Sequence, residues 1–224
     1  MDSMGLSGGF VASAGQSFKM ICLELLDAAY TEVRAEKVVT QEWEENAISE
    51  IIAERMNNNP EAIQRFITVE LEKRMITEAW CESSVSVNAA PRIDIKIGGF
   101  SWNPNLSRVQ CFMEAKNLYG DDFRKANNST ITSSSYYGKR YVLTGINNVL
   151  SSHYPGETIL LGYVLVGSIQ KAVDKVNEQL SLLSRDEERV SMQAQSGFPH
   201  LDMGVSRHPN GATMDHYFLL FPRT

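Results

Sequence analysis

Ionisable residues interrupt two apolar, strand-like segments of this chain. Asp94 lies between two isoleucines, and Glu114 and Lys116 directly follow the apolar run 111–113. Successive side chains of a strand point to opposite faces, so Glu114 and Lys116 share one face. Carboxylates from neighbouring strands can converge on one cation, and oxygen ligands suit Mg²⁺ or Mn²⁺. With a lysine that orients a water beside a bound metal, this set could hydrolyse a phosphodiester.

The residues around this set predict strands that could bring the two carboxylates together. Residues 84–87 and 92–97 alternate between polar and apolar side chains, and a further strand is predicted over 108–115. The 19 residues between Asp94 and Glu114 suit a strand, a hairpin and a return. Gly98-Gly99 indicates a bend or a bulge, and residues 103–105 indicate a turn. We therefore predict an antiparallel meander of three strands.

Helical periodicity predicts the elements on either side of the meander. Apolar residues recur at helical spacing over 15–33, and a second helix is predicted after Thr40, a good N-cap residue. Pro60 suits the first position of a third helix, through about Met75. Residues 117–135 and 184–197 are predicted to be loops. Further helices are predicted over 136–150 and 169–183, and further strands over 158–166 and 213–221. The fold class is α/β, with a central mixed sheet flanked by helices.

Composition favours a globular protein and excludes several classes. The chain has 224 residues, 43% hydrophobic residues and a net charge of −6, which disfavours non-specific binding to nucleic acids. The segment 116–140 is nevertheless locally basic. The three cysteines form no CxxC pair, which disfavours a zinc ribbon or a disulfide framework and favours a cytoplasmic location. The longest apolar run, 158–169, is about half the length of a membrane span, so no membrane partner is expected.

The order of elements and the residues on the strands resemble a known family. Asp on the second strand of the meander and Glu-x-Lys on the third are similar to the core motif of the PD-(D/E)XK nuclease superfamily. The matching residues are Pro91-Arg92-Ile93-Asp94 and Phe112-Met113-Glu114-Ala115-Lys116. The resemblance covers roughly residues 40–180. It departs from the family pattern in that Pro91 is not adjacent to Asp94.

The resemblance implies a restriction-endonuclease-like core and a role for each matching residue. Asp94, Glu114 and the backbone carbonyl of Ala115 would hold Mg²⁺ or Mn²⁺, and Lys116 would assist the attacking water. Members often add a glutamate from the preceding helix, and Glu45 fits that position best. Glu50 and Glu54 are its rivals.

The resemblance also implies a substrate and a setting. DNA is favoured over RNA, because most of the superfamily acts on DNA, and restriction or phage defence is an analogy only. A phosphate-binding rim is expected from Lys139 and Arg140, with Arg124 and Lys125 as further candidates. His208 and His216 near the end of the chain are more simply interpreted as structural residues.

The domain organisation and one competing function remain open at this point. The first fourteen residues are expected to form a flexible leader, and residues 15–224 a single PD-(D/E)XK-like domain. The competing function is a non-catalytic module of the same fold that binds nucleic acid or dimerises. The acidic pI of about 5.3 favours the second interpretation, and the complete Asp94, Glu114 and Lys116 set favours the first.

Overall fold

The computed structural model of the protein describes residues 8–74, 92–99, 109–126, 130–151, 157–194, 197–209 and 211–221. Four features of the sequence lie outside these ranges: the strand predicted over 84–87, the turn predicted over 103–105, Pro91 and Cys81. No helix within the ranges combines the length and the apolar character needed to cross a bilayer.

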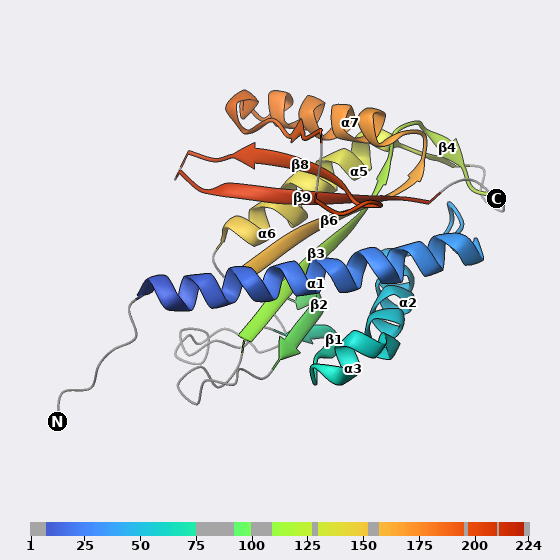
Figure 1. The fold of residues 1–224 in the computed structure, drawn as a ribbon. Coiled ribbons are helices and arrows are strands. Elements are labelled where there is room, and N and C mark those ends of the chain that lie inside the picture. The colour runs from blue at the N-terminus through green and yellow to red at the C-terminus, as the bar shows by residue number, and fades with distance from the viewer. Residues whose placement is uncertain are drawn as a thin grey trace.

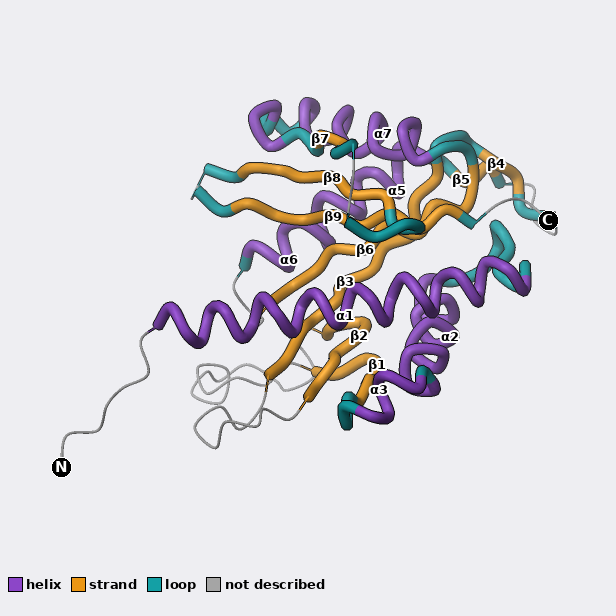
Figure 2. The backbone as a smooth tube through the Cα atoms, viewed as in Figure 1, coloured by secondary structure: helices purple, strands orange, loops and turns teal. Residues whose placement is uncertain are grey.

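The described chain begins with helices, continues with a group of strands, and then changes between helical and strand segments toward its end (Figures 1 and 2). The helical elements are α1 (Gly8–Glu36), α2 (Glu45–Asn58), α3 (Pro60–Gln64), α5 (Ser134–Arg140), the π-helical turn η2 (Tyr141–Ile146), α6 (Asn147–Leu150), α7 (Ile169–Leu182) and the 3₁₀ turn η3 (Asp186–Glu188). The strands are β1 (Thr68–Arg74), β2 (Arg92–Gly99), β3 (Val109–Tyr119), β4 (Phe123–Arg124), β5 (Ile131–Thr132), β6 (Glu157–Val166), β7 (Ser191–Met192), β8 (Asp202–Arg207) and β9 (Thr213–Leu220).

A mixed sheet forms the centre of the described molecule. Its seven described strands follow the order β1-β2-β3-β6-β9-β8-β7. The pairs β3–β6 and β6–β9 are parallel, whereas the strands on either side of this centre pair antiparallel. Strands β4 and β5 form a separate small hairpin. The predicted α/β class with a central mixed sheet is therefore confirmed.

Helices cover both faces of this sheet, which accounts for the burial of β3 on both sides. On one face α1 and α2 pack with the larger apolar core, which includes Cys22, Leu26, Ile48 and Ile52. On the other face η2 and α7 pack with a second core around Tyr141 and Phe218. Figure 1 shows α1 along one side of the sheet and α5, α6 and α7 along the other. Residues Cys111 to Gly120 are buried without interruption, as expected for a strand covered on both faces.

Several predicted boundaries of the N-terminal half are wrong. The first helix begins at Gly8, so the last seven residues assigned to the leader are helical. The second begins at Glu45, with Glu44 and not Thr40 at its N-cap position. The third ends at Gln64, and strand β1, which pairs with β2, begins at Thr68. Asn59 caps this third helix by accepting a hydrogen bond from the N–H of Glu61, with Pro60 at the first position.

Parts of the segments predicted as loops or bends form strands. Strand β3 continues to Tyr119 because β6 pairs with it up to that residue, apart from an irregularity near Leu118. The loop predicted over 117–135 therefore starts later, and it contains the β4–β5 hairpin. The bend or bulge predicted at Gly98-Gly99 is wrong, since both glycines pair with β3 in regular register as part of β2. Strand β8 was not predicted at all, although it pairs with β9 over six residue pairs.

Candidate functional site

Strand β3 places a carboxylate and an ammonium group inside the protein. Glu114 and Lys116 are only 3% and 5% exposed. The Lys116 Nζ lies 2.8 Å from the Glu114 Oε1, in keeping with two side chains on the same face of the strand. Buried charges are costly unless they are paired, so this pair needs partners from other elements.

Strand β2 supplies one of these partners where its ladder with β3 ends. The ladder runs from Gly99–Val109 to Ile95–Met113, and Asp94 is the next residue of β2. Its carboxylate Oδ2 accepts a hydrogen bond of 2.7 Å from the N–H of Ala115. The side chain thus replaces a backbone acceptor of the ladder and is fixed against β3. The same Oδ2 lies 3.5 Å from the Lys116 Nζ.

Helix α2 supplies the third carboxylate from its first residue. The Oε1 of Glu45 accepts a hydrogen bond of 3.1 Å from the Lys116 ammonium, and its Oε2 accepts one of 3.1 Å from the N–H of Asn117. The Asn117 side chain in turn donates to the carbonyl of Trp43, just before the helix. These bonds attach the N-terminus of α2 to β3.

The two rival glutamates of α2 lie elsewhere. Glu54 is 3.6 Å from Arg55 in an ion pair on the outer side of the helix. Glu50 is exposed and lines a pocket of about 240 Å³ together with Asp94, Asn46, Ser49 and Leu71. This pocket lies between α2 and strands β1 and β2. Of the three glutamates, Glu45 is the one in contact with Lys116.

Lys116 therefore lies at the centre of an oxygen shell. Its Nζ also donates a hydrogen bond of 2.5 Å to the Ala115 carbonyl. Three carboxylates and one carbonyl, from α2, β2 and β3, contact a single ammonium group. We call these residues, Glu45, Asp94, Glu114, Ala115 and Lys116, the acidic cluster. All five were proposed from the sequence.

The protonation states in the acidic cluster follow from burial and charge. Burial raises the pKa of Glu114 to about 7, because a buried carboxylate loses its hydration; Lys116 opposes this shift and Asp94 adds to it. Burial alone would lower the pKa of Lys116, but attraction by Glu114, Asp94 and Glu45 outweighs it and raises that pKa. Lys116 is therefore charged at neutral pH, and Glu114 is the member of the cluster poised to exchange a proton.

A helical segment over the cluster contributes a residue that was not predicted. The Asn148 side chain of α6 donates a hydrogen bond of 3.3 Å to the Glu114 Oε1. The preceding turn, η2, passes close to the lysine: a Cβ added at Gly145 would lie 3.4 Å from the Lys116 Cγ. Nothing in the sequence distinguishes Asn148 from the other polar residues of the predicted helix. Only the fold identifies it as a residue of the site. π-helical turns such as η2 are frequent at functional sites.

The basic residues predicted to form a rim lie on two elements. Lys125, after β4, is 3.5 Å from Glu44, the residue before Glu45. Arg124 is exposed on β4. On α5, Lys139 is exposed, and the Arg140 guanidinium lies over the Tyr137 ring at 5.8 Å. Lys125 is thus placed beside the start of α2.

Comparisons with known proteins give no further guide to this arrangement. No protein-family model, no curated protein and no solved structure matches the chain. The membership of a family is therefore not shown, and a function has to be argued from the geometry of the chain itself.

The acidic cluster has the donor types of a metal site. In the described ranges no group of three or more His, Cys, Asp or Glu side chains is arranged to hold a metal ion. The donor types do fit a hard cation, because carboxylate and carbonyl oxygens are the ligands that Mg²⁺ and Mn²⁺ prefer. The four oxygens now surround a monovalent ammonium at 2.5 to 3.5 Å. Cation binding would require them to close around an ion in place of that group.

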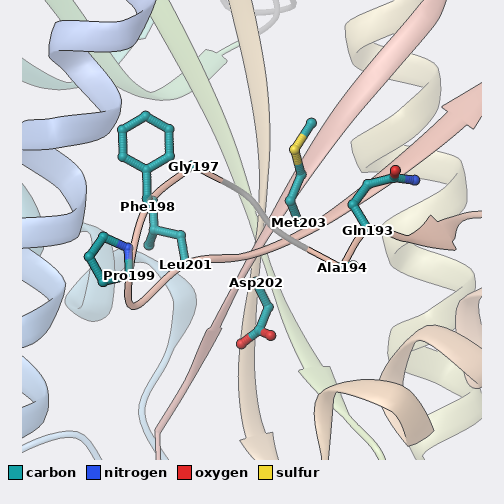
Figure 3. A pocket seen from close by; sticks show the side chains of 8 residues that line it. All are labelled: Gln193, Ala194, Gly197, Phe198, Pro199, Leu201, Asp202 and Met203. Carbon is teal, nitrogen blue, oxygen red and sulfur yellow. The ribbon is translucent and has the colours of Figure 1, made fainter.

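A larger pocket lies away from the cluster. It has a volume of about 420 Å³ and is lined by the connection between β7 and β8 and by the start of β8, with Gln193, Phe198 and Asp202 among its residues (Figure 3). Its lining includes none of the residues proposed from the sequence. Figure 3 shows the Asp202 carboxylate and the Phe198 ring on separate sides of the loop, without a convergent set of polar groups.

Proposed function

We propose that this protein is a metal-dependent phosphodiesterase of the PD-(D/E)XK type, a nuclease that acts on DNA. One observation carries the proposal: carboxylates from α2, β2 and β3 meet at the Lys116 ammonium, together with the carbonyl of Ala115. An ordinary surface ion pair joins two solvated groups. Here three buried or half-buried carboxylates contact one lysine, although each buried charge loses favourable solvation.

The donor set supports Mg²⁺ or Mn²⁺ as the cofactor. Asp94, Glu114 and the Ala115 carbonyl would hold the ion, and Glu45 would support the site from the helix. When bound, such a metal supplies Lewis-acid stabilisation of a phosphoryl oxygen and a water of lowered pKa. Lys116 is not a ligand, because a protonated ammonium has no lone pair. Its role is to orient the attacking water and to neutralise negative charge that develops on the phosphate.

The basic residues proposed from the sequence support a polyanionic substrate. Lys125 lies beside the start of α2, and Arg124 and Lys139 are exposed. Cations of this kind position a phosphate backbone without reading its sequence. We propose DNA rather than RNA, and defence against foreign DNA as the setting, on the strength of the family resemblance alone.

A second function is favoured by a different observation. Lys116 already satisfies three carboxylates, and the described residues contain no ready-made group of three metal-binding side chains. An acidic cluster of this kind could be a purely structural ion network in a non-catalytic module that binds nucleic acid or dimerises. The two functions differ in one property, which is whether the cluster takes up a divalent cation.

Calorimetric titration with Mn²⁺ separates these two functions. The nuclease proposal expects one Mn²⁺ per chain in the wild type, loss of that binding in Asp94→Asn, and unchanged binding in the control Asp121→Asn, whose acid pairs with Lys171 away from the cluster. Mn²⁺-dependent cleavage of plasmid or single-stranded DNA should follow the same pattern. A wild-type protein that neither binds Mn²⁺ nor cleaves either DNA would support the structural module instead.

A further inference from the structure

A second group of buried polar residues joins η2 to strands β9 and β8 and to the turn η3. The Tyr141 hydroxyl is 3.0 Å from His216 Nδ1, and His216 Nε2 is 2.8 Å from the Ser206 hydroxyl. That hydroxyl is also 2.8 Å from His208 Nε2, and His208 Nδ1 bonds to the Glu188 carboxylate. All five residues are at most 5% exposed. We call this series the polar chain.

The polar chain is not a second catalytic site. Ser206, His208 and Glu188 follow the hydrogen-bond order of a hydrolase triad, and this is the most obvious chemical interpretation of the three. However, Ser206 is 1% exposed and His208 is 5% exposed. The Ser206 hydroxyl is also shared with His216. A substrate carbonyl could not reach this hydroxyl, so the order of the groups must serve another purpose.

The donors and acceptors of the polar chain form one consistent series. Burial lowers the pKa of His216 to about 3, so its imidazole is neutral. Hydrogen bonds from Arg185 are the main cause that lowers the pKa of Glu188 to about 2, so its carboxylate only accepts. His208 Nδ1–H therefore donates to Glu188. One arrangement that satisfies every group has each donate to the next, from Tyr141 through His216, Ser206 and His208 to Glu188. A fully satisfied buried network of this kind is rigid.

The polar chain reaches the segment above the acidic cluster at both ends. At one end Tyr141 is the first residue of η2. At the other, Arg185 donates two bonds to Glu188, at 2.7 and 2.6 Å, and one of 2.8 Å to the side chain of Asn147. Asn147 is the first residue of α6 and directly precedes Asn148, which bonds to Glu114. The segment from Tyr141 to Asn148 is thus held at its start and at its end.

We propose that the polar chain with Arg185 positions Asn148 on Glu114 and so sets the geometry of the acidic cluster. In this role Asn148 and the members of the polar chain are positioning residues, since none of them would contact a substrate. The segment contains the π-helical turn η2, a backbone form that is rare but frequent at functional sites, and the polar chain fixes this turn from outside. The expected effect on metal binding and catalysis rests on the proposed function. The expected position of the Asn148 side chain does not.

Two buried tyrosines provide a matched pair of variants. Tyr141→Phe removes the hydroxyl that bonds to His216, and Tyr30→Phe removes a hydroxyl that bonds to the Leu220 carbonyl on the opposite face of the sheet. Both side chains are at most 1% exposed. A third variant, Asn147→Ala, breaks the link to Arg185 at the half-buried end of the segment. It still tests the proposal if Tyr141→Phe does not fold.

The experiment records the side-chain amide signals of Asn148 by NMR and the Mn²⁺ affinity of each variant. Asn148→Asp identifies the signals by removing them. In Tyr141→Phe and Asn147→Ala the Asn148 signals should move toward the positions of solvent-exposed asparagines, and Mn²⁺ affinity should fall about 10-fold or more, as for other outer partners of metal ligands. Tyr30→Phe should change neither quantity, whatever it does to the melting temperature.

The outcomes distinguish this proposal from the proposed function. Unchanged Asn148 signals in both Tyr141→Phe and Asn147→Ala would overturn the positioning role, even if both variants melt at lower temperature. Moved signals in a protein whose wild type does not bind Mn²⁺ would support the positioning role and refute the nuclease. Moved signals with unaltered Mn²⁺ affinity would confine the role to Asn148 and overturn its influence on the cluster.

Discussion

Lys116 and Glu45 lie 71 residues apart in the sequence, and their ammonium and carboxylate groups meet at 3.1 Å. The contact joins the central strand β3 to the first residue of α2. It places a helix N-terminus, where negative charge is favoured, directly beside the carboxylates of the sheet. Predictions about the cluster follow from this arrangement of one cation among three acids.

Replacing Lys116 should separate metal binding from chemistry. Lys116→Met removes the ammonium that now occupies the centre of the carboxylates, so Mn²⁺ affinity should stay the same or increase. DNA cleavage should fall roughly 100-fold or more, because the water and the transition state lose their partner. Lys96→Met is the matched control, since Lys96 lies on β2 and pairs with Glu70 at 3.6 Å. If Lys116→Met cleaved at the wild-type rate, the lysine would have no part in the mechanism.

Asp94→Asn should lose Mn²⁺ and activity together while the fold is kept. The asparagine oxygen can still accept the hydrogen bond from the N–H of Ala115 that Asp94 accepts at 2.7 Å. The variant lacks the negative charge of the Asp94 carboxylate, which the proposed Mn²⁺ site requires. Calorimetry, DNA cleavage and the melting temperature together test this expectation. A variant that unfolds instead would show that the Asp94 charge stabilises the fold through Lys116.

The helix glutamates should differ in their effect on Mn²⁺ affinity. Glu45→Gln removes a charge that contacts Lys116 and should weaken Mn²⁺ binding about 10-fold or more. Glu54→Gln should have no effect, because Glu54 pairs with Arg55 on the outer side of α2. Glu50→Gln tests the remaining rival, which lines the pocket beside Asp94. An effect of Glu50→Gln larger than that of Glu45→Gln would transfer the role to Glu50 without changing the mechanism.

Metal binding should depend on pH through Glu114. Its pKa is raised from 4.5 to about 7 in the metal-free fold, and a cation binds only the deprotonated form. Mn²⁺ affinity should therefore fall by up to about tenfold per pH unit below pH 7 and level off above it. The stability that Glu114 contributes is fully present below pH 4.5 and is lost as the pH rises through about 7.

The measurement is Mn²⁺ affinity and melting temperature from pH 5 to pH 9, with Glu114→Gln as the variant that cannot titrate at this position. The metal-free variant should lack the part of the pH dependence that the wild type shows between about 4.5 and 7. An identical pH dependence in both proteins would assign the effect to another group.

The basic residues should govern DNA binding through charge alone. Lys139→Ala/Arg140→Ala and Arg124→Ala/Lys125→Ala should each weaken DNA binding for all sequences and reduce its salt dependence, since fewer counterions are released. Arg65→Ala is a suitable control, because Arg65 pairs with Glu61 beside α3. Unchanged salt slopes in both double variants would exclude these residues from the DNA contact.

The chemistry-bearing residues could be selected from the sequence because they break a local pattern. An acid between two isoleucines and a Glu-x-Lys at the end of an apolar run are unusual wherever they occur in strands. Alternation alone placed Glu114 and Lys116 on one face, and the structure confirms their contact at 2.8 Å. Local patterns similarly sufficed for β2, by alternation, and for β6, by its apolar run. The predicted bounds of β2, β6 and β9 differ from the observed ones by at most two residues.

Tertiary structure decided what local patterns do not encode. Residues 68–74 alternate only around Val69 and Leu71 and end in a charged run. They form β1 because β2 pairs with them, which shortened the predicted third helix. The resemblance favoured Glu45 but left Glu50 and Glu54 as rivals, since helical spacing alone does not say which residue faces β3. The contacts of Asn148 with Glu114 and of His216 with Tyr141 join elements 34 and 75 residues apart. Such pairings depend on how helices pack across the sheet, and that packing is a property of the whole chain.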